Sequence, residues 1–242
     1  MEKFDKILNK KEKIVIKEAD FVKQYPDFFK NIGKEELHKD NMLTYENEKL
    51  SISLKYEEIS PEQYPAEKFP GFYYMSMIGE VDFDDYFRLT EFKIKNENFE
   101  YDLKSESKNP IVLFLKESNP KKTDGAAYSE ENLITLNSLP SSPGSILTLL
   151  HELGHINDDK INEDISRKLH LRFETIMKGG SDEKIEKEQN AITIRQERVA
   201  WAYALKKLKP FIEGFQIPEE SLDKYIHEFT LGSYCKEMTE EY

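Results

Sequence analysis

The sequence predicts an α+β protein, with a β-rich N-terminal region followed by a mostly helical region that contains a small sheet. Two observations carry this prediction. In the first half, apolar residues alternate with polar ones, as in Leu50–Tyr56, which is typical of a half-buried strand. From residue 141 onward, apolar residues recur at the helical period, and serine, proline and glycine stand where helices begin and end.

Composition limits the classes of partner. The chain has 242 residues, a formal net charge of -12 and 38% hydrophobic residues, so we expect neither nucleic acid nor an anionic membrane as a partner. The first residues are charged where a signal peptide is apolar, and no run approaches the ~20 apolar residues of a membrane span. The single cysteine, Cys235, cannot form an intramolecular disulfide. We therefore expect a cytoplasmic protein.

The N-terminal region should consist of short elements separated by prolines. Asn96–Asn98 is flanked by alternating apolar residues, which indicates a hairpin. The other expected elements are a short strand or helix at 14–16 with irregular helical turns after it, strands at 50–56 and 72–78, and some helix around 82–90. The polar stretch Lys104–Asn109 then divides the chain into residues 1–105, with no assignable role, and a domain over 106–242.

The second region begins with two buried strands, Ile111–Leu115 and Leu133–Leu136, separated by a loop around residues 119–125. Four helices should follow. The first begins with a serine cap before Pro143, the second covers 161–178 and ends at two glycines, the third runs from 183 to 208, and the last covers 218–231. Residues 199–205 are apolar on every side, so we expect them to be buried.

The chemistry is concentrated in His151-Glu152-Leu153-Gly154-His155, an H-E-x-x-H pattern inside the first of these helices. Residues four apart lie on one face of a helix, so His151 and His155 can hold one metal ion. Glu152 stands beside them and can accept a proton from a water at the metal. The pattern predicts a zinc site with Glu152 as its general base.

A catalytic zinc usually has a third protein ligand. A third histidine six residues after His155 is excluded, because Ile161 stands there. We expect a glutamate of the long third helix, either Glu197 or Glu188, each followed by alanine three residues later. The two lie on opposite faces of a helix. Glu197 is favoured because it leads into the apolar stretch, and because small residues there can approach Gly154 closely. His170 is expected to be solvated, and His227 could stand at the rim of the cleft.

Three stretches resemble the ImmA/IrrE family of zinc metallopeptidases. They are Ile134-Thr135-Leu136-Asn137, then Leu149–Ile156 with its H-E-L-G-H, and Glu197–Leu205 with its E-x-x-A frame. The resemblance covers residues 110–209 at most. It implies a zincin-like core and a gluzincin site in which Zn²⁺ is held by His151, His155 and Glu197. It also implies a peptide or protein substrate inside the cell.

We accordingly expect a zinc metalloendopeptidase. Candidates for a further donor to the oxyanion are Tyr128, Tyr203 and His227, and the strand 133–136 could be an edge that pairs with an extended substrate. The acidic residues Asp158, Asp159, Glu163 and Asp164 are expected to form a solvated surface, although one of them could orient a histidine. The alternative is a catalytically silent, zincin-like protein that binds a partner.

Overall fold

A computed structural model describes residues 26–38, 41–65, 67–77, 85–116, 125–180, 182–218 and 220–222, and the statements below concern those residues. One curled, mixed sheet of eight strands runs in the order β1-β2-β3-β4-β6-β8-β7, with β5 paired to β4. Only β6 and β8 are parallel. The strands are β1 (Lys34–His38), β2 (Met42–Glu46), β3 (Ser51–Glu58), β4 (Tyr86–Lys95), β5 (Glu100–Asp102), β6 (Ile111–Leu115), β7 (Gly125–Tyr128) and β8 (Leu133–Leu136).

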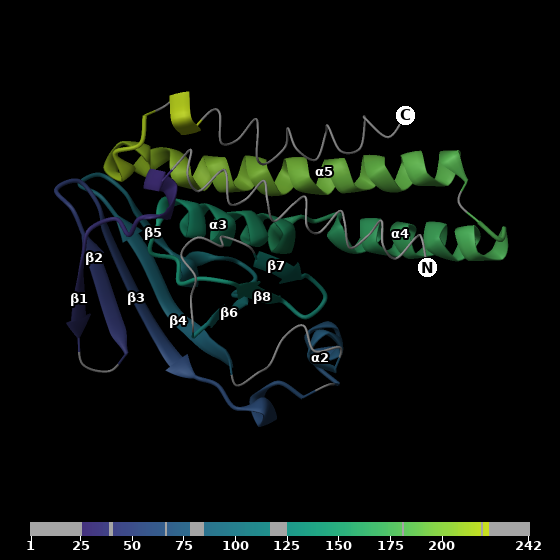
Figure 1. The fold of residues 1–242 in the computed structure, drawn as a ribbon, viewed down its shortest axis with the longest axis horizontal. Helices are drawn as coiled ribbons and strands as arrows, with labels where there is room; N and C mark the ends of the chain where they lie inside the picture. The colour runs from purple at the N-terminus through teal and green to yellow at the C-terminus, as the bar shows by residue number, and fades with distance from the viewer. Residues whose placement is uncertain are drawn as a thin grey trace.

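Helices cover one end of this sheet (Figure 1). The helices at that end are α3 (Pro143–Asn157), α4 (Ile161–Met177) and α5 (Glu183–Leu208), whereas α2 (Pro70–Met77) lies apart from them. Short 3-10 turns lie at Pro26–Phe29, Pro61–Gln63, Leu103–Ser105 and Lys209–Phe215. Helix α3 packs on β7 and β8 and lies against α5, while α4 runs beside the first half of α5 and projects beyond the sheet. None of the described helices is both long and apolar enough to cross a membrane.

The main elements expected from the sequence are confirmed. Residues 50–56 lie largely in β3, the hairpin around Asn96–Asn98 is the β4–β5 pair, and 111–115 and 133–136 are β6 and β8. The three helices of the H-E-x-x-H region are α3, α4 and α5. Ala202 is exposed, however, so the apolar stretch 199–205 is buried on one face only. The protein therefore has the predicted α+β class.

Two predicted elements are wrong. Residues 72–77 form the end of α2 rather than a strand, because the carboxylate of Glu131 accepts the N–H groups of Gly71 and Phe72 in the first turn of that helix. Residues 86–90 belong to β4 rather than to a helix. Tyr86 belongs to a second core cluster on the opposite face of the strand from Leu89, and a register shift opposite Lys55 and Tyr56 lies between Leu89 and Phe92. Buried residues therefore recur at every third position, Tyr86, Leu89 and Phe92. That spacing imitates a helix.

The expected division near residue 105 does not interrupt the sheet, because β4 pairs with β6 across it. Glu106, which the sequence places in a polar seam, is only 6% exposed. Its carboxylate accepts hydrogen bonds from Tyr101, Tyr203, Lys207 and Asn157. Burial alone would raise the pKa of Glu106. The hydrogen bonds from its donors and the charge of Lys207 have the larger combined effect, so the pKa lies below its usual value. Glu106 thus joins the hairpin to α3 and α5.

Several predicted features lie outside the described residues. These are the element at 14–16 with the helical turns before Pro26, most of the loop at 119–125, the greater part of the last helix, His227 and Cys235. Of that last helix, residues 220–222 are described and are helical.

Candidate metal centre

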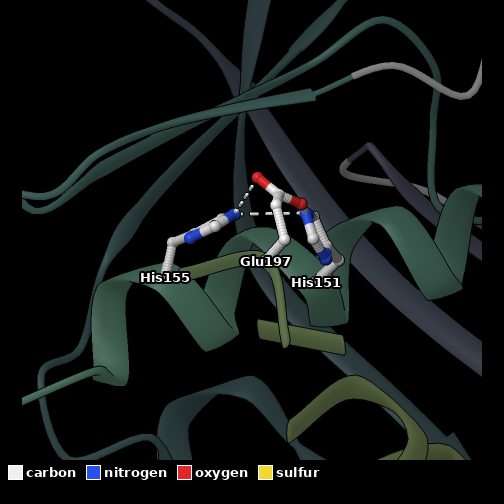
Figure 2. A group of neighbouring side chains, drawn as sticks. All are labelled: His151, His155 and Glu197. Atoms are coloured by element: carbon white, nitrogen blue, oxygen red, sulfur yellow. Dashed lines mark hydrogen bonds and ion pairs between the residues drawn. The ribbon is translucent and has the colours of Figure 1, made fainter. Parts of the chain in front are cut away.

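Helix α3 carries the two histidines in its last two turns. It begins at a capping box, in which Ser142 and Ser145 each bond the other's backbone N–H, and Pro143 occupies the first turn. Almost every residue of α3 is buried, from Pro143 to Ile156. A buried, well-capped helix is a rigid support, and it presents His151 and His155 on one face (Figure 2).

Helix α5 approaches α3 closely at one point. A Cβ built on Gly154 would lie 2.6 Å from both Cα and O of Ala200, so only glycine permits this distance between the two backbones. Ala200 follows Glu197 by three residues and therefore lies on nearly the same face of α5. The sequence predicted that small residues of α5 approach Gly154, and the contact with Ala200 brings Glu197 over the histidines.

The three side chains converge. Nε2 of His151 and Nε2 of His155 are 3.1 Å apart, Oε2 of Glu197 is 3.3 Å from Nε2 of His151, and Oε1 is 3.5 Å from Nε2 of His155. The carboxylate stands between the two rings in Figure 2. All three side chains are largely buried, with 9 to 14% of their surface exposed. Among the described residues, this is the one group whose donor atoms are placed to share a metal ion.

The geometry fits one tetrahedral zinc ion. Ligand atoms about 2.0–2.1 Å from a tetrahedral ion are separated by about 3.3 Å, close to the observed separations. Burial, with the nearby His151, lowers the pKa of His155 to about 4, so its ring is neutral and can donate a lone pair. Oε2 of Glu197 is buried and forms no hydrogen bond within the described chain. Two imidazoles and a carboxylate are also a donor set found at catalytic zinc.

Trp201 orients His151, a role that the sequence analysis did not identify. The two rings stack with centroids 4.0 Å apart and planes tilted by 33°. A metal-binding histidine usually fixes its ring through a hydrogen bond from the second nitrogen. Nδ1 of His151 is buried and has no such bond to any described residue, so the indole ring performs this task by packing. The sequence could have indicated this role, because Trp201 follows Glu197 by four residues and lies on the same face of the helix.

Arg195 fixes the position of α5 near the centre. Its guanidinium donates to both carboxylate oxygens of Asp158, at the end of α3, and to Asp164 on α4. The expectation of a solvated surface is therefore wrong for Asp158, which is 7% exposed, and for the partly buried Asp164. It is confirmed for Asp159 and Glu163, which are exposed. The carboxylate of Asp158 holds α5 through Arg195, and among the described residues it bonds to no histidine side chain.

Glu152 lies beneath the start of β7. It is 7% exposed, and a Cβ on Gly125 would lie 2.9 Å from its Cγ, so glycine is needed where the strand crosses α3. The prediction that strand 133–136 is an edge is wrong, because β8 is paired on both sides, with β6 and with β7. The edge strand beside the site is β7, whose second side has no partner strand in the described part of the chain.

The other candidates lie elsewhere. Glu188 is partly exposed on α5 and pairs with Arg167, and His170 is exposed and pairs with Glu174, as expected of solvated residues. The hydroxyl of Tyr203 donates to Glu106. Tyr128 lies on β7, where its ring contacts Phe72 edge to face. The structure therefore brings together His151, His155 and Glu197, and none of Glu188, His170 and Tyr203 joins them.

The contact between Gly154 and Ala200 yields a first prediction. Replacing Gly154 with alanine should lower the free energy of unfolding by about 1–3 kcal/mol, because the new methyl group has only backbone atoms to displace. It should also weaken zinc binding, since α5 carries Glu197. Urea denaturation and zinc titration measure the two effects. Gly180→Ala is the matched control, because a Cβ there meets nothing within 4 Å. Equal stability of the two variants would contradict the prediction.

Comparison of the chain with protein-family models, with curated proteins and with solved structures gave no match in any of the three.

Proposed function

We propose that this protein is a zinc-dependent metalloendopeptidase with a zincin-like core. The observation that carries the proposal is the convergence of His151, His155 and Glu197 from two packed helices, with Glu152 one residue away on α3. The neutral histidine ring and the buried carboxylate favour a divalent cation, and the separations suit tetrahedral zinc.

A zinc ion held there would make a water more acidic and stabilise negative charge on a carbonyl oxygen. The residues of the chain supply the remaining functions. Glu152 accepts the proton of the attacking water and returns it to the leaving amine, which is general base followed by general acid catalysis. Trp201 holds the ring of His151, and Arg195 holds the segment of α5 that carries Glu197.

A peptide substrate is supported by the sheet edge. The second side of β7 can accept an extended chain through backbone hydrogen bonds. Gly125 at the start of that strand approaches Glu152, so a peptide paired with β7 would pass beside the general base. We infer an extended segment of a specific cytoplasmic protein as the substrate. This edge explains why the site would act on a peptide rather than on a small molecule.

Two measurements test the proposal. Purified protein should contain about one zinc per chain by elemental analysis, since the described residues offer one three-ligand group. A library of extended peptides should be hydrolysed, with loss of activity on treatment with a chelator and recovery on addition of zinc. No bound zinc after loading would contradict the site. Bound zinc without hydrolysis of any peptide or protein would instead favour the catalytically silent binding protein.

A further inference from the structure

A second cavity lies apart from the metal centre, at the opposite end of α3. Its volume is about 410 Å³, within the range of small-molecule sites. Among the described residues, it lies between side chains of β2, β3, β4 and β6 and the segment Ser138–Ser142, which leads into α3. None of His151, His155 and Glu197 lines it, so its occupant need not be the peptidase substrate.

One wall of the cavity is aromatic. Tyr56, Phe87 and Phe114 come from the adjacent strands β3, β4 and β6, and their ring centroids lie 5.0 to 5.7 Å apart. Phe114 is almost fully buried, whereas Tyr56 and Phe87 are only partly covered. Three neighbouring rings that still expose surface to a cavity favour a planar, aromatic ligand, which gains both apolar contact and ring packing.

The opposite wall offers a hydroxyl group without a hydrogen bond. Ser138 is 4% exposed and lines the cavity, and its side chain bonds to no described residue. Ser141, on the same wall, differs because its hydroxyl donates to Oδ1 of Asn31 at 2.8 Å. The oxygen of Ser138 is not fully enclosed by the protein, so it is open to the cavity. A ligand with a hydrogen-bonding edge can therefore bond to this hydroxyl.

The charges around the cavity exclude a strongly ionic ligand. Its charged side chains are one exposed acid, Glu35, and one exposed base, Lys116, so they cancel. Nζ of Lys116 lies 5.1 Å from the centre of the Phe87 ring, so this ammonium group already has a cation-π partner. Binding of a phosphate or another polyanion would need several unpaired bases. The remaining polar side chains are neutral hydroxyls and the amide of Asn31, which suit a neutral ligand.

We propose that this cavity binds a small, uncharged heteroaromatic molecule, whose ring packs on Tyr56, Phe87 and Phe114 while its edge hydrogen-bonds to Ser138. The chemical class is that of a nucleobase or an indole. The site is independent of the proposed peptidase activity, since it requires neither zinc nor Glu152.

Adenine and indole are suitable probes. Saturation-transfer NMR on the full-length, zinc-free chain should detect binding of at least one of them, and a titration gives its Kd. Cyclohexanol, which has a hydroxyl but no aromatic ring, should bind more weakly than the better of the two. Absence of binding by both probes at millimolar concentration, or equal binding of cyclohexanol, would overturn the proposal.

Variants then locate the binding site. Ser138→Ala should weaken binding about 2- to 10-fold, the effect of one neutral hydrogen bond, and Phe87→Leu should weaken it by a similar factor through loss of ring packing. Ser107→Ala, an exposed serine elsewhere, should leave the Kd unchanged. Circular dichroism verifies that each variant is folded, and Tyr56→Leu replaces Phe87→Leu if the latter unfolds. Unchanged affinity in both cavity variants would overturn the assignment.

Discussion

Replacement of Glu152 with glutamine should lower kcat for peptide hydrolysis by about 10²- to 10⁴-fold, the contribution of a positioned general base. Glutamine keeps the size of the side chain, which matters because Glu152 is buried and lies against Gly125 of β7. It cannot accept a proton from water. Since His151, His155 and Glu197 are unchanged, the variant should still bind zinc with the affinity of the parent protein. Loss of turnover with retention of zinc separates the base from the ligands.

Glu163→Gln is the matched control for this experiment. It makes the same chemical change at an exposed position of α4, so it should alter neither kcat nor zinc content. Rates should be measured on zinc-loaded protein, with zinc determined on the same samples. A Glu152→Gln variant that hydrolyses peptides at the parental rate would exclude the proposed role of Glu152. A variant that loses zinc would instead give this side chain a structural role at the centre.

The sequence predicted that His151, His155 and Glu197 converge, because two local rules suffice for that. Spacing of four on a helix brings His151 and His155 together, and helical phase separates Glu197 from Glu188. Both rules need only that the helices exist, and α3 and α5 carry strong caps at Ser142 and Asp182. The close approach of α5 to α3 at Gly154 was also predicted, and the structure identifies Ala200 as the residue in contact there.

The incorrect predictions concern elements whose structure depends on residues distant in the sequence. Helix α2 has its first turn fixed by Glu131, about sixty residues further along the chain. The helix-like spacing of Tyr86, Leu89 and Phe92 arises because β4 is buried on both faces and because its pairing with β3 has a register shift after Leu89. Asp158 is buried because Arg195 reaches it from another helix. Such pairings leave no periodic signal in a single sequence.

The identity of the sheet edge was missed for a different reason. Strand β7 has the sequence Gly125-Ala126-Ala127-Tyr128, whose four residues are all partly buried and show no alternation. Small residues are needed there because α3 passes close beneath, as the contact between Gly125 and Glu152 illustrates. The strand that reads most clearly as apolar, β8, is instead buried between two neighbours. The edge proposed to receive a peptide is therefore the strand with the weaker pattern in the sequence.

Replacement of Glu197 with alanine should weaken zinc binding at least about 100-fold, more than the loss of an outer-shell partner. Two histidines alone would remain, 3.1 Å apart. The loss of zinc binding should also reduce the stabilisation of the folded protein by zinc. A ligand that binds only the folded state stabilises it by about 4 kcal/mol at a thousand times its Kd, so the rise in Tm on adding zinc should largely disappear. Competition with a fluorescent chelator and thermal unfolding with and without zinc measure the two effects.

Glu188→Ala provides the decisive comparison, because it removes the same side chain from the opposite face of the same helix. It breaks only an exposed ion pair with Arg167, which contributes about 0–1 kcal/mol, so zinc affinity and the zinc-dependent rise in Tm should match the parent protein. If Glu197→Ala unfolds, Glu197→Gln keeps the shape of the side chain while removing its charge. Retention of zinc by both Glu197 variants, or its loss in Glu188→Ala, would mean that the third ligand is not Glu197.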